Sequence, residues 1–289
     1  MYALSGTTHI LGIIGNPVRH SLSPAMQNAA LAECGLDYIY VPFAVPPEYL
    51  GAAVSGLRAL GVTGFNVTIP HKTAIMSYLS HLDESAEAAG AVNTVLVQDG
   101  LMTGYNTDGF GLISSLADDL GFVAGNGTIV IIGAGGAARG AVAALCRVGA
   151  ERIILTNRTL SKAIELAEDM RARYPKTGIA AYHQDQINEN LLDSASLLVN
   201  TTSIGMNGER IDFVDLAKLP KGAKVYDMVY SPLHTPLLKE AASIGIEAVN
   251  GLGMLAAQGE MAFSIWTGRM PPKGLMKRVL QRVCNLTTA

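Results

Sequence analysis

The chain has 289 residues, of which 49% are hydrophobic, and this length and composition allow two domains with packed cores. Its 21 basic and 24 acidic residues are nearly balanced and form no run of either sign, which argues against a nucleic-acid groove or a charged membrane patch. Small metabolites are therefore the expected partners, and the composition is compatible with a monomer or a homodimer.

Cysteines and the amino terminus indicate the compartment. Cys34, Cys146 and Cys284 form no CxxC pair and have apolar neighbours, as reduced core thiols do. No basic region precedes the short apolar run at 10–14, and no stretch reaches the roughly 20 apolar residues of a spanning helix. The histidines show no metal-ligand spacing. We expect a cytoplasmic protein without a metal.

Short apolar runs alternate with alanine-rich stretches in the first half of the chain. This alternation predicts a mostly parallel α/β sheet that helices cover on both faces. The expected strands are at 9–14, 38–43, 64–68 and 91–97.

Two turn signals refine this first sheet. Ser23 is a plausible N-cap for a helix at 25–33, with Pro24 in its first turn. Asp99-Gly100 favours a tight primed turn and predicts a hairpin, so that one strand should be antiparallel.

A glycine turn lies between an apolar strand and a small-residue helix at 127–140. Gly133 and Gly135 have no Cβ, so the chain can turn sharply and approach a pyrophosphate, at which the next helix points its free N–H groups. The pattern predicts a dinucleotide site, although glycines also occur at ordinary strand-to-helix turns.

The strand at 152–156 ends in Asn157, Arg158 and Thr159, and Lys162 follows in the next helical pattern. In such βαβ units an acid about 20 residues past the glycines takes the ribose 2′-hydroxyl of NAD, whereas an arginine accommodates the 2′-phosphate of NADP. Since no acid is present here, NADP is favoured. The alternative is that Arg158 and Lys162 are only the solvated start of a helix.

The second half completes a Rossmann dinucleotide-binding domain with strands expected at 178–182, 196–200, 224–227 and 246–249. Helical stretches at 251–266 and 272–283 follow this domain and are expected to fold back on the first half. We predict two domains, 1–107 plus 251–289 for the substrate and 108–250 for NADP. Linkers are expected near 106–112 and Gly251, with the active cleft between the domains.

Polar residues follow the strands of the first half, and open α/β sheets bind ligands at strand carboxyl ends. Ser21 and Ser23 beside a helix N-terminus suit a carboxylate, although Ser-x-Ser-Pro is also a common capping turn. Lys72 is expected in the first turn of a helix that Pro70 can start, where a cation is unfavourable and another purpose is indicated. The other polar residues of this group are Asn66, Thr68, Asn93 and Asp108.

Seven segments together resemble the shikimate dehydrogenase family, in that family's order and over nearly the whole chain. They are GNPVRHSLSP at 15–24, NVTIPHK at 66–72, GAVNT at 90–94, NTDG at 106–109, NRT at 157–159, NTTSIGM at 200–206 and GLGMLAAQG at 251–259. The resemblance implies hydride transfer between NADP and shikimate, forming 3-dehydroshikimate, in aromatic amino-acid biosynthesis.

The resemblance also implies roles, with Lys72 and Asp108 as the catalytic residues. It implies substrate contacts from Ser21, Ser23, Asn66, Thr68, Asn93, Asp108, Tyr230 and Gln258. It implies cofactor contacts from Glu84, Gly133, Ala134, Gly135, Gly136, Ala137, Asn157, Arg158, Thr159, Lys162, Met228 and Gly251. Relatives often carry arginine at the position of Lys162; lysine keeps the charge but loses bidentate geometry, so weaker selectivity for the phosphate is expected.

The direction of proton transfer follows from lysine chemistry. An ordinary lysine is protonated at neutral pH, and a neighbouring carboxylate favours the ammonium further. Lys72 is therefore expected to act as the general acid in reduction, with Asp108 as its partner. A quinate or dual quinate/shikimate dehydrogenase, with NAD possible, is the alternative enzyme. A non-catalytic NADP-binding regulator is the other alternative, but it would have no need of the proton-transfer pair.

Overall fold

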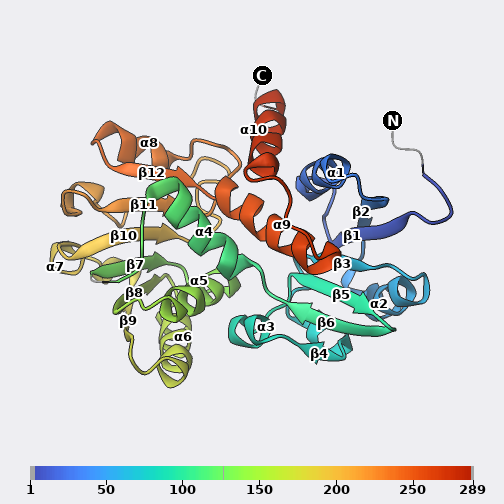
Figure 1. Cartoon of the computed structure of the whole chain (residues 1–289). Coiled ribbons are helices and arrows are strands. Elements are labelled where there is room, and N and C mark those ends of the chain that lie inside the picture. The colour runs from blue at the N-terminus through green and yellow to red at the C-terminus, as the bar shows by residue number, and fades with distance from the viewer. Residues whose placement is uncertain (1–3, 126, 288–289) are drawn as a thin grey trace. The chain divides into compact units, whose positions relative to one another are not determined.

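The computed structural model describes residues 4–125 and 127–287, and the chain divides into two α/β units (Figure 1). The first unit comprises Met1–Gly111 and Leu255–Ala289, and the second comprises Leu112–Met254. Both boundaries fall inside helices, α4 (Asp108–Leu120) and α9 (Leu252–Thr267). The chain therefore passes between the units through helices, where the sequence suggested loops.

The sheet of the first unit has the strand order β2-β1-β3-β5-β6-β4. Strand β5 is antiparallel to β3 and β6, and the other pairs in this sheet are parallel, as predicted. The strands are β1 (His9–Gly15), β2 (Tyr38–Ala44), β3 (Gly64–Val67), β4 (His81–Leu82), β5 (Thr94–Gln98) and β6 (Leu101–Tyr105).

The predicted hairpin is confirmed between β5 and β6. Its turn residues Asp99 and Gly100 have φ values of 51° and 75°, the left-handed region that both central residues of a type I′ turn require. Strand β5 begins at Thr94, three residues later than expected, so that Asn93 lies just before the strand.

One face of this sheet packs against short helices, since Val54, Ile75 and Ala86 from three of them share a buried cluster with Phe65. On β3, a Cβ at Gly64 would lie 2.3 Å from the Trp266 indole, whose Nε1 donates to Val95 O at 2.9 Å. A glycine in the strand therefore allows α9 to lie on the sheet. The remaining helices of this unit are α1 (Ser23–Glu33), η1 (Pro47–Tyr49), α2 (Leu50–Ala59), η2 (Ala74–Tyr78), α3 (Glu84–Ala89) and α10 (Leu275–Thr287).

Two predictions about helix starts are wrong. Helix α1 begins at Ser23 itself, and the Ser23 N–H donates to Ser21 Oγ at 3.3 Å, so Ser23 is not the N-cap. Lys72 lies in a turn before η2 and not in a helix. The reason is that its carbonyl oxygen accepts from the Val92 N–H at 2.8 Å, which draws the backbone toward a segment distant in sequence.

The second unit contains a parallel sheet in the order β12-β11-β10-β7-β8-β9. Counted from β7, this is the strand order 3-2-1-4-5-6 of the Rossmann fold, which confirms the predicted fold class. The strands are β7 (Thr128–Ile132), β8 (Arg152–Asn157), β9 (Gly178–His183), β10 (Ala195–Asn200), β11 (Lys224–Asp227) and β12 (Glu247–Asn250).

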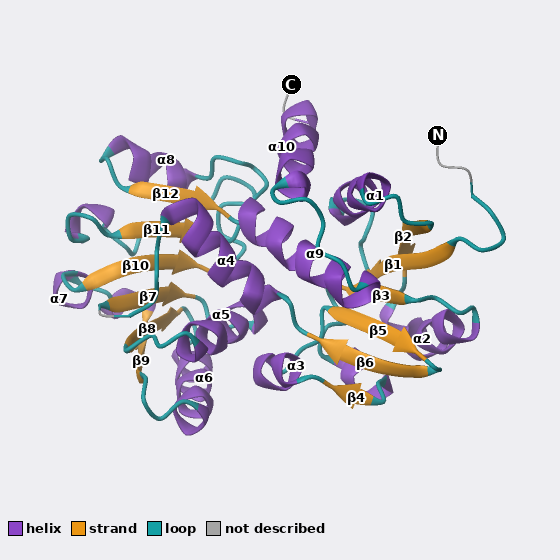
Figure 2. Ribbon diagram, viewed as in Figure 1, coloured by secondary structure: helices purple, strands orange, loops and turns teal. Residues whose placement is uncertain are grey.

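Alternate residues of β7 enter different cores, as the period of two in a strand requires. Ile129 and Ile131 pack with residues of α4, α5 and α6, whereas Val130 and Ile132 pack with residues of α7 and α8. Helices therefore cover both faces of this sheet (Figure 2). They are, besides α4, α5 (Gly136–Arg147), α6 (Leu160–Arg173), η3 (Gln184–Gln186), α7 (Glu189–Leu192), η4 (Leu216–Lys218) and α8 (Pro236–Ser243).

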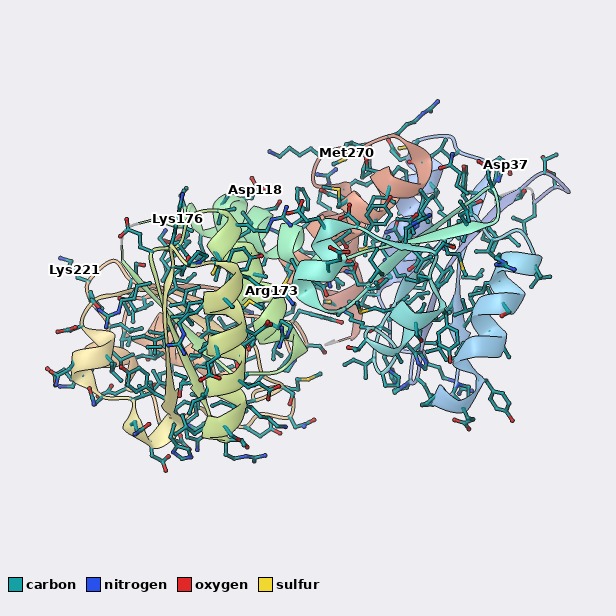
Figure 3. All side chains as sticks on the ribbon, turned by 90° about the horizontal axis from the view of Figure 1, so that it is seen from below. Asp37, Asp118, Arg173, Lys176, Lys221 and Met270 are labelled. Carbon is teal, nitrogen blue, oxygen red and sulfur yellow. The ribbon has the colours of Figure 1, made fainter. Side chains whose placement is uncertain are left out.

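Many charged side chains lie on the surface, among them Lys176 and Lys221 (Figure 3). Within residues 4–125 and 127–287, no helix combines the length and apolar character that crossing a membrane requires.

Candidate active site

A lysine and a carboxylate meet in the first unit. Lys72 follows β3 and donates from Nζ to Asp108 Oδ2 at 2.6 Å. Asp108 is the first residue of α4, where the helix dipole stabilises a negative charge. The two side chains are 33% and 25% exposed, so the ammonium group is accessible to a bound molecule.

Asn93 holds the other oxygen of this carboxylate. Its Nδ2 donates to Asp108 Oδ1 at 2.8 Å and to Thr107 Oγ1 at 3.0 Å. Its Oδ1 accepts from the Thr107 N–H at 2.9 Å. A backbone N–H can only donate, so this contact fixes which end of the Asn93 amide faces Asp108. Each Asp108 oxygen therefore has its own donor.

Gln258 reaches the same cluster from α9. Its Oε1 accepts from Thr107 Oγ1 at 3.4 Å and from Asn93 Nδ2 at 3.5 Å, both long contacts that a ligand can readily replace. The structure thus brings together four residues that the sequence proposed, namely Lys72, Asp108, Asn93 and Gln258.

The serine segment and Thr68 lie at the carboxyl ends of β1 and β3. Ser21 is half-buried and Ser23 is buried. A Cβ at Gly15 would lie 2.4 Å from Thr68 Cγ2, so the segments that follow the two strands are in close contact. Polar groups from both strand ends therefore share one edge of the sheet, where α/β sheets bind ligands.

Asn66 is deeply buried and bonded on both sides of its amide. Tyr40, which the sequence analysis did not single out, donates its hydroxyl to Asn66 Oδ1 at 2.7 Å. Burial raises the pKa of the Tyr40 phenol well above its usual range, and a hydrogen bond with Ser23 opposes this rise. Tyr40 is therefore a neutral donor.

In the second unit, the glycine turn after β7 has the geometry of a phosphate site. Gly133 has φ +113°, and a Cβ there would lie 2.6 Å from Thr201 Oγ1. Helix α5 begins at Gly136 with Gly135 as its N-cap, and neither glycine has a surrounding heavy atom within 4 Å of an added Cβ. Room and free N–H groups at a helix N-terminus suit an anion.

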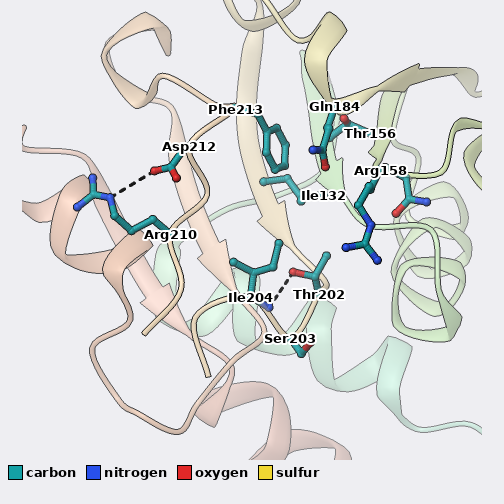
Figure 4. A pocket seen from close by; sticks show the side chains of 12 residues that line it. Ile132, Thr156, Arg158, Gln184, Thr202, Ser203, Ile204, Arg210, Asp212 and Phe213 are labelled. Atoms are coloured by element: carbon teal, nitrogen blue, oxygen red, sulfur yellow. Dashed lines mark hydrogen bonds and ion pairs between the residues drawn. The ribbon is translucent and has the colours of Figure 1, made fainter. Parts of the chain in front are cut away.

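A pocket of about 660 Å³ lies at the carboxyl ends of β7, β8 and β10 (Figure 4). Arg158 lies on one side, and Arg210, paired with Asp212 at 3.5 Å, lies on the other. Arg158, which lines the pocket, and Lys162, which follows it in the sequence, are exposed and make no side-chain hydrogen bond or ion pair with any residue that the structure describes. Arg158 therefore brings unneutralised positive charge to the pocket.

Thr156, at the end of β8, is also a pocket residue and is fully buried. Its Oγ1 has no hydrogen-bond partner within the described chain, and an unpaired buried polar group is costly unless a ligand satisfies it. The sequence analysis missed this residue, although its place at a strand end was a usable signal. The pocket residues to which the sequence analysis gave no cofactor role are Thr156, Gln184, Thr202, Ser203, Ile204, Arg210, Asp212 and Phe213, of which Thr202, Ser203 and Ile204 lie in the quoted segment 200–206.

Met228, Tyr230 and Gly251 follow β11 and β12, and a Cβ at Gly251 would lie 2.2 Å from Met228 O. This close approach requires glycine. Glu84 belongs to the first unit, as the exposed first residue of α3, whereas the other predicted cofactor residues belong to the second.

Asp227, at the end of β11, is a buried carboxyl that the sequence analysis also missed. It accepts from Asn200 Nδ2 at 2.9 Å, Val229 N–H at 3.1 Å and Thr235 Oγ1 at 2.6 Å. Burial raises the pKa of Asp227 above its usual value, and these three donors oppose the rise. The signal in the sequence that could have identified Asp227 was an acidic residue at the end of an apolar strand.

The Rossmann sheet, its glycine turn and a cationic pocket define a dinucleotide-binding protein. With a lysine–carboxylate pair in the other unit, the class is that of the nicotinamide-dependent dehydrogenases.

Comparison with known proteins identifies the family. Three family models match: "Shikimate dehydrogenase substrate binding domain" at residues 13–95, "Shikimate / quinate 5-dehydrogenase" at 116–204 and "Shikimate 5'-dehydrogenase C-terminal domain" at 251–281. The shikimate dehydrogenase (NADP(+)) of Geobacter sp. strain M21 is 52% identical over 278 residues, which is 96% of each chain.

Solved structures agree with this result. A shikimate dehydrogenase crystallised with NADP+ has a TM-score of 0.89 at 41% identity, and the match covers 98% of both chains. Shikimate 5-dehydrogenase of Listeria monocytogenes, in complex with shikimate and NAD, has a TM-score of 0.90 at 34% identity, covering 97% of this chain and 99% of that one. This chain belongs to the shikimate dehydrogenase family, as its motifs indicated.

Proposed function

We propose that the protein is an oxidoreductase that interconverts 3-dehydroshikimate and shikimate with NADP, in aromatic amino-acid biosynthesis. The names of its relatives support this activity. The observation that carries the proposal is the Lys72–Asp108 pair, with Asn93 on the second carboxylate oxygen.

Residues 1–107 plus 251–289 are proposed to form the domain that binds the substrate, and residues 108–250 the domain that binds NADP, limits that lie a few residues from those of the two units. The proposed substrate residues are Ser21, Ser23, Asn66, Thr68, Asn93, Asp108, Tyr230 and Gln258. The proposed cofactor residues are Glu84, Gly133, Ala134, Gly135, Gly136, Ala137, Asn157, Arg158, Thr159, Lys162, Met228 and Gly251.

The residues of the second unit fit NADP. The glycine turn leaves the start of α5 open to a pyrophosphate, and the exposed cations Arg158 and Lys162 suit a 2′-phosphate. When bound in its reduced form, the cofactor supplies the hydride.

Lys72 is the proposed general acid for reduction. Its ammonium group polarises the ketone oxygen of 3-dehydroshikimate and gives a proton to that oxygen as the alcohol forms. Asp108 holds the ammonium in place through Oδ2. Ser21 and Ser23 would hold the substrate carboxylate, since hydroxyl donors at the start of α1 stabilise an anion.

Quinate dehydrogenase is the second candidate, because the matching family model for residues 116–204 names both activities. Steady-state kinetics of the purified protein with shikimate or quinate, and NADP or NAD, separate the candidates. We expect the highest kcat/KM with shikimate and NADP. Faster turnover with quinate or NAD would favour the second candidate, and no turnover with any pair would contradict both.

We further propose a monomer or homodimer that works in the cytoplasm on small molecules, without a nucleic-acid or membrane partner. The near balance of charges and the free thiols of Cys34, Cys146 and Cys284 support this proposal.

A further inference from the structure

A chain of buried hydrogen bonds leads away from Asp108 in the first unit. Asn93, which donates to Asp108 Oδ1 at 2.8 Å, accepts on its Oδ1 from Thr94 Oγ1 at 3.0 Å. Thr94 Oγ1 accepts in turn from Asn66 Nδ2 at 3.0 Å. Asn66 Oδ1 accepts from the Tyr40 hydroxyl at 2.7 Å. The chain therefore joins Tyr40, on the second strand of the sheet, to the catalytic carboxylate.

The direction of every bond in this chain is fixed by its neighbours. Asn66 Nδ2 also donates to the Asn93 carbonyl at 3.0 Å, and a carbonyl oxygen can only accept. Asn66 must therefore present Oδ1 to Tyr40, so the phenol donates. The Thr94 hydroxyl, which accepts from Asn66, has its single proton left for Asn93. The chain runs one way, from the phenol to the carboxylate.

Solvent has no access to this chain. Tyr40, Asn66, Thr94 and Asn93 are 1%, 4%, 0% and 3% exposed. Water is therefore not available to replace a missing member, and a fully satisfied buried network holds its side chains in one arrangement.

We propose that Thr94 and Tyr40 are positioning residues for the reaction. Together with the Thr107 N–H, the chain holds the Asn93 amide with its NH2 toward Asp108 Oδ1, which leaves Oδ2 to face Lys72. Neither side chain is accessible to a substrate, since Thr94 is 0% and Tyr40 is 1% exposed. The proposal rests on the proposed function, in which the Lys72–Asp108 pair transfers the proton.

Two substitutions at one position isolate the hydroxyl. Thr94→Val keeps the shape and removes both hydrogen bonds, whereas Thr94→Ser keeps the hydroxyl. We expect Thr94→Val to lower kcat about tenfold, because small misplacements of reacting groups are costly, with the KM for NADP within about twofold. Thr94→Ser should rescue kcat to within about threefold of the wild type. Thr128→Val, the same change at a buried strand threonine of the second unit, is the matched control and should leave kcat unchanged.

Measuring Thr94→Val in a protein that also carries Asn93→Ala distinguishes positioning of Asn93 from a purely structural role of Thr94. If Thr94 acts through Asn93, Thr94→Val should cause no further loss of kcat there. A wild-type kcat for folded Thr94→Val, or an equal loss in both backgrounds, would overturn the proposal.

Tyr40→Phe keeps the ring beside Trp266 and removes the hydroxyl with its contacts to Asn66 and Ser23, so it carries the test if Thr94→Val does not fold. We expect a loss of kcat of about threefold that disappears in the Asn93→Ala background. If the kcat of Tyr40→Phe is unchanged, the positioning proposal is overturned. The proposed function still stands in that case, provided that the wild-type protein turns over shikimate. Absence of wild-type turnover of shikimate would instead overturn the proposed function and this inference together.

Discussion

In the first unit the polar groups around Lys72 bind one another, whereas in the second unit Arg158 and Lys162 bind no other side chain that the structure describes. The first arrangement is complete before a ligand arrives. The exposed cations of the second unit gain side-chain or phosphate partners only when a ligand binds. Changes in the first unit should therefore act on kcat, and changes at the pocket should act on the KM for the cofactor.

The largest effect is expected from Lys72→Ala. Loss of the general acid should lower kcat at least about 100-fold, with little change in the KM for shikimate. Steady-state kinetics measure both constants, and Lys176→Ala, at an exposed lysine of the second unit, is the control. An unchanged kcat with a raised KM would make Lys72 a binding residue.

Arg158→Ala tests the prediction that changes at the pocket of the second unit act on the KM for the cofactor. Loss of a charge-assisted contact with the 2′-phosphate should raise the KM for NADP about 10- to 100-fold and leave kcat nearly unchanged. The KM for NAD, which has no 2′-phosphate, should not change, and this serves as the internal control. Equal losses with NADP and NAD would show that Arg158 does not read the phosphate.

Gly133→Ala should cost stability because of backbone geometry. The φ of +113° strains any L side chain, and the new Cβ would lie 2.6 Å from Thr201 Oγ1. We expect a loss of about 1–3 kcal/mol in the free energy of unfolding, measured with denaturant. Gly140→Ala, on α5 with open space around it, is the control and should not destabilise. Equal stability of the two variants would contradict the turn geometry.

The smallest effect concerns Asp227, whose pKa in the folded protein lies above its usual value because the carboxyl is buried. The unfolded chain ionises this carboxyl at lower pH, so its contribution to stability falls as pH rises from about 4 through the folded pKa. Asparagine does not ionise, so Asp227→Asn does not lose this stability as the pH rises. The Tm of the variant minus that of the wild type should therefore increase with pH.

Thermal melts across this pH range give the difference directly. Asp193→Asn, at an exposed carboxyl, should show no such trend. A difference for Asp227→Asn that stays constant or falls with pH would contradict the raised pKa.

Local patterns were sufficient for most of the fold. The apolar runs of β8, β10 and β11 are largely buried, so their hydrophobic pattern is strong, and the limits of β8 to β12 were predicted within one residue. Asp99-Gly100 was recognisable because the turn type depends on those two residues alone.

Contacts between distant segments account for what the sequence missed. The turn at Lys72 depends on a hydrogen bond from Val92, and the role of Tyr40 depends on Asn66, 26 positions later. Thr156 is notable only because no neighbour satisfies its hydroxyl, which no local pattern predicts. The motifs identified Lys72, Asp108 and Asn93 individually, but only the structure gives each Asp108 oxygen its donor.

The central claim is that Lys72 and Asp108 act as one unit, and a double-mutant cycle of kcat with Lys72→Ala and Asp108→Asn tests it most directly. Residues that act together show strongly non-additive losses. The double variant should therefore be about as slow as the slower single variant. Losses that multiply in the double variant would show that the two side chains act independently and would contradict the claim.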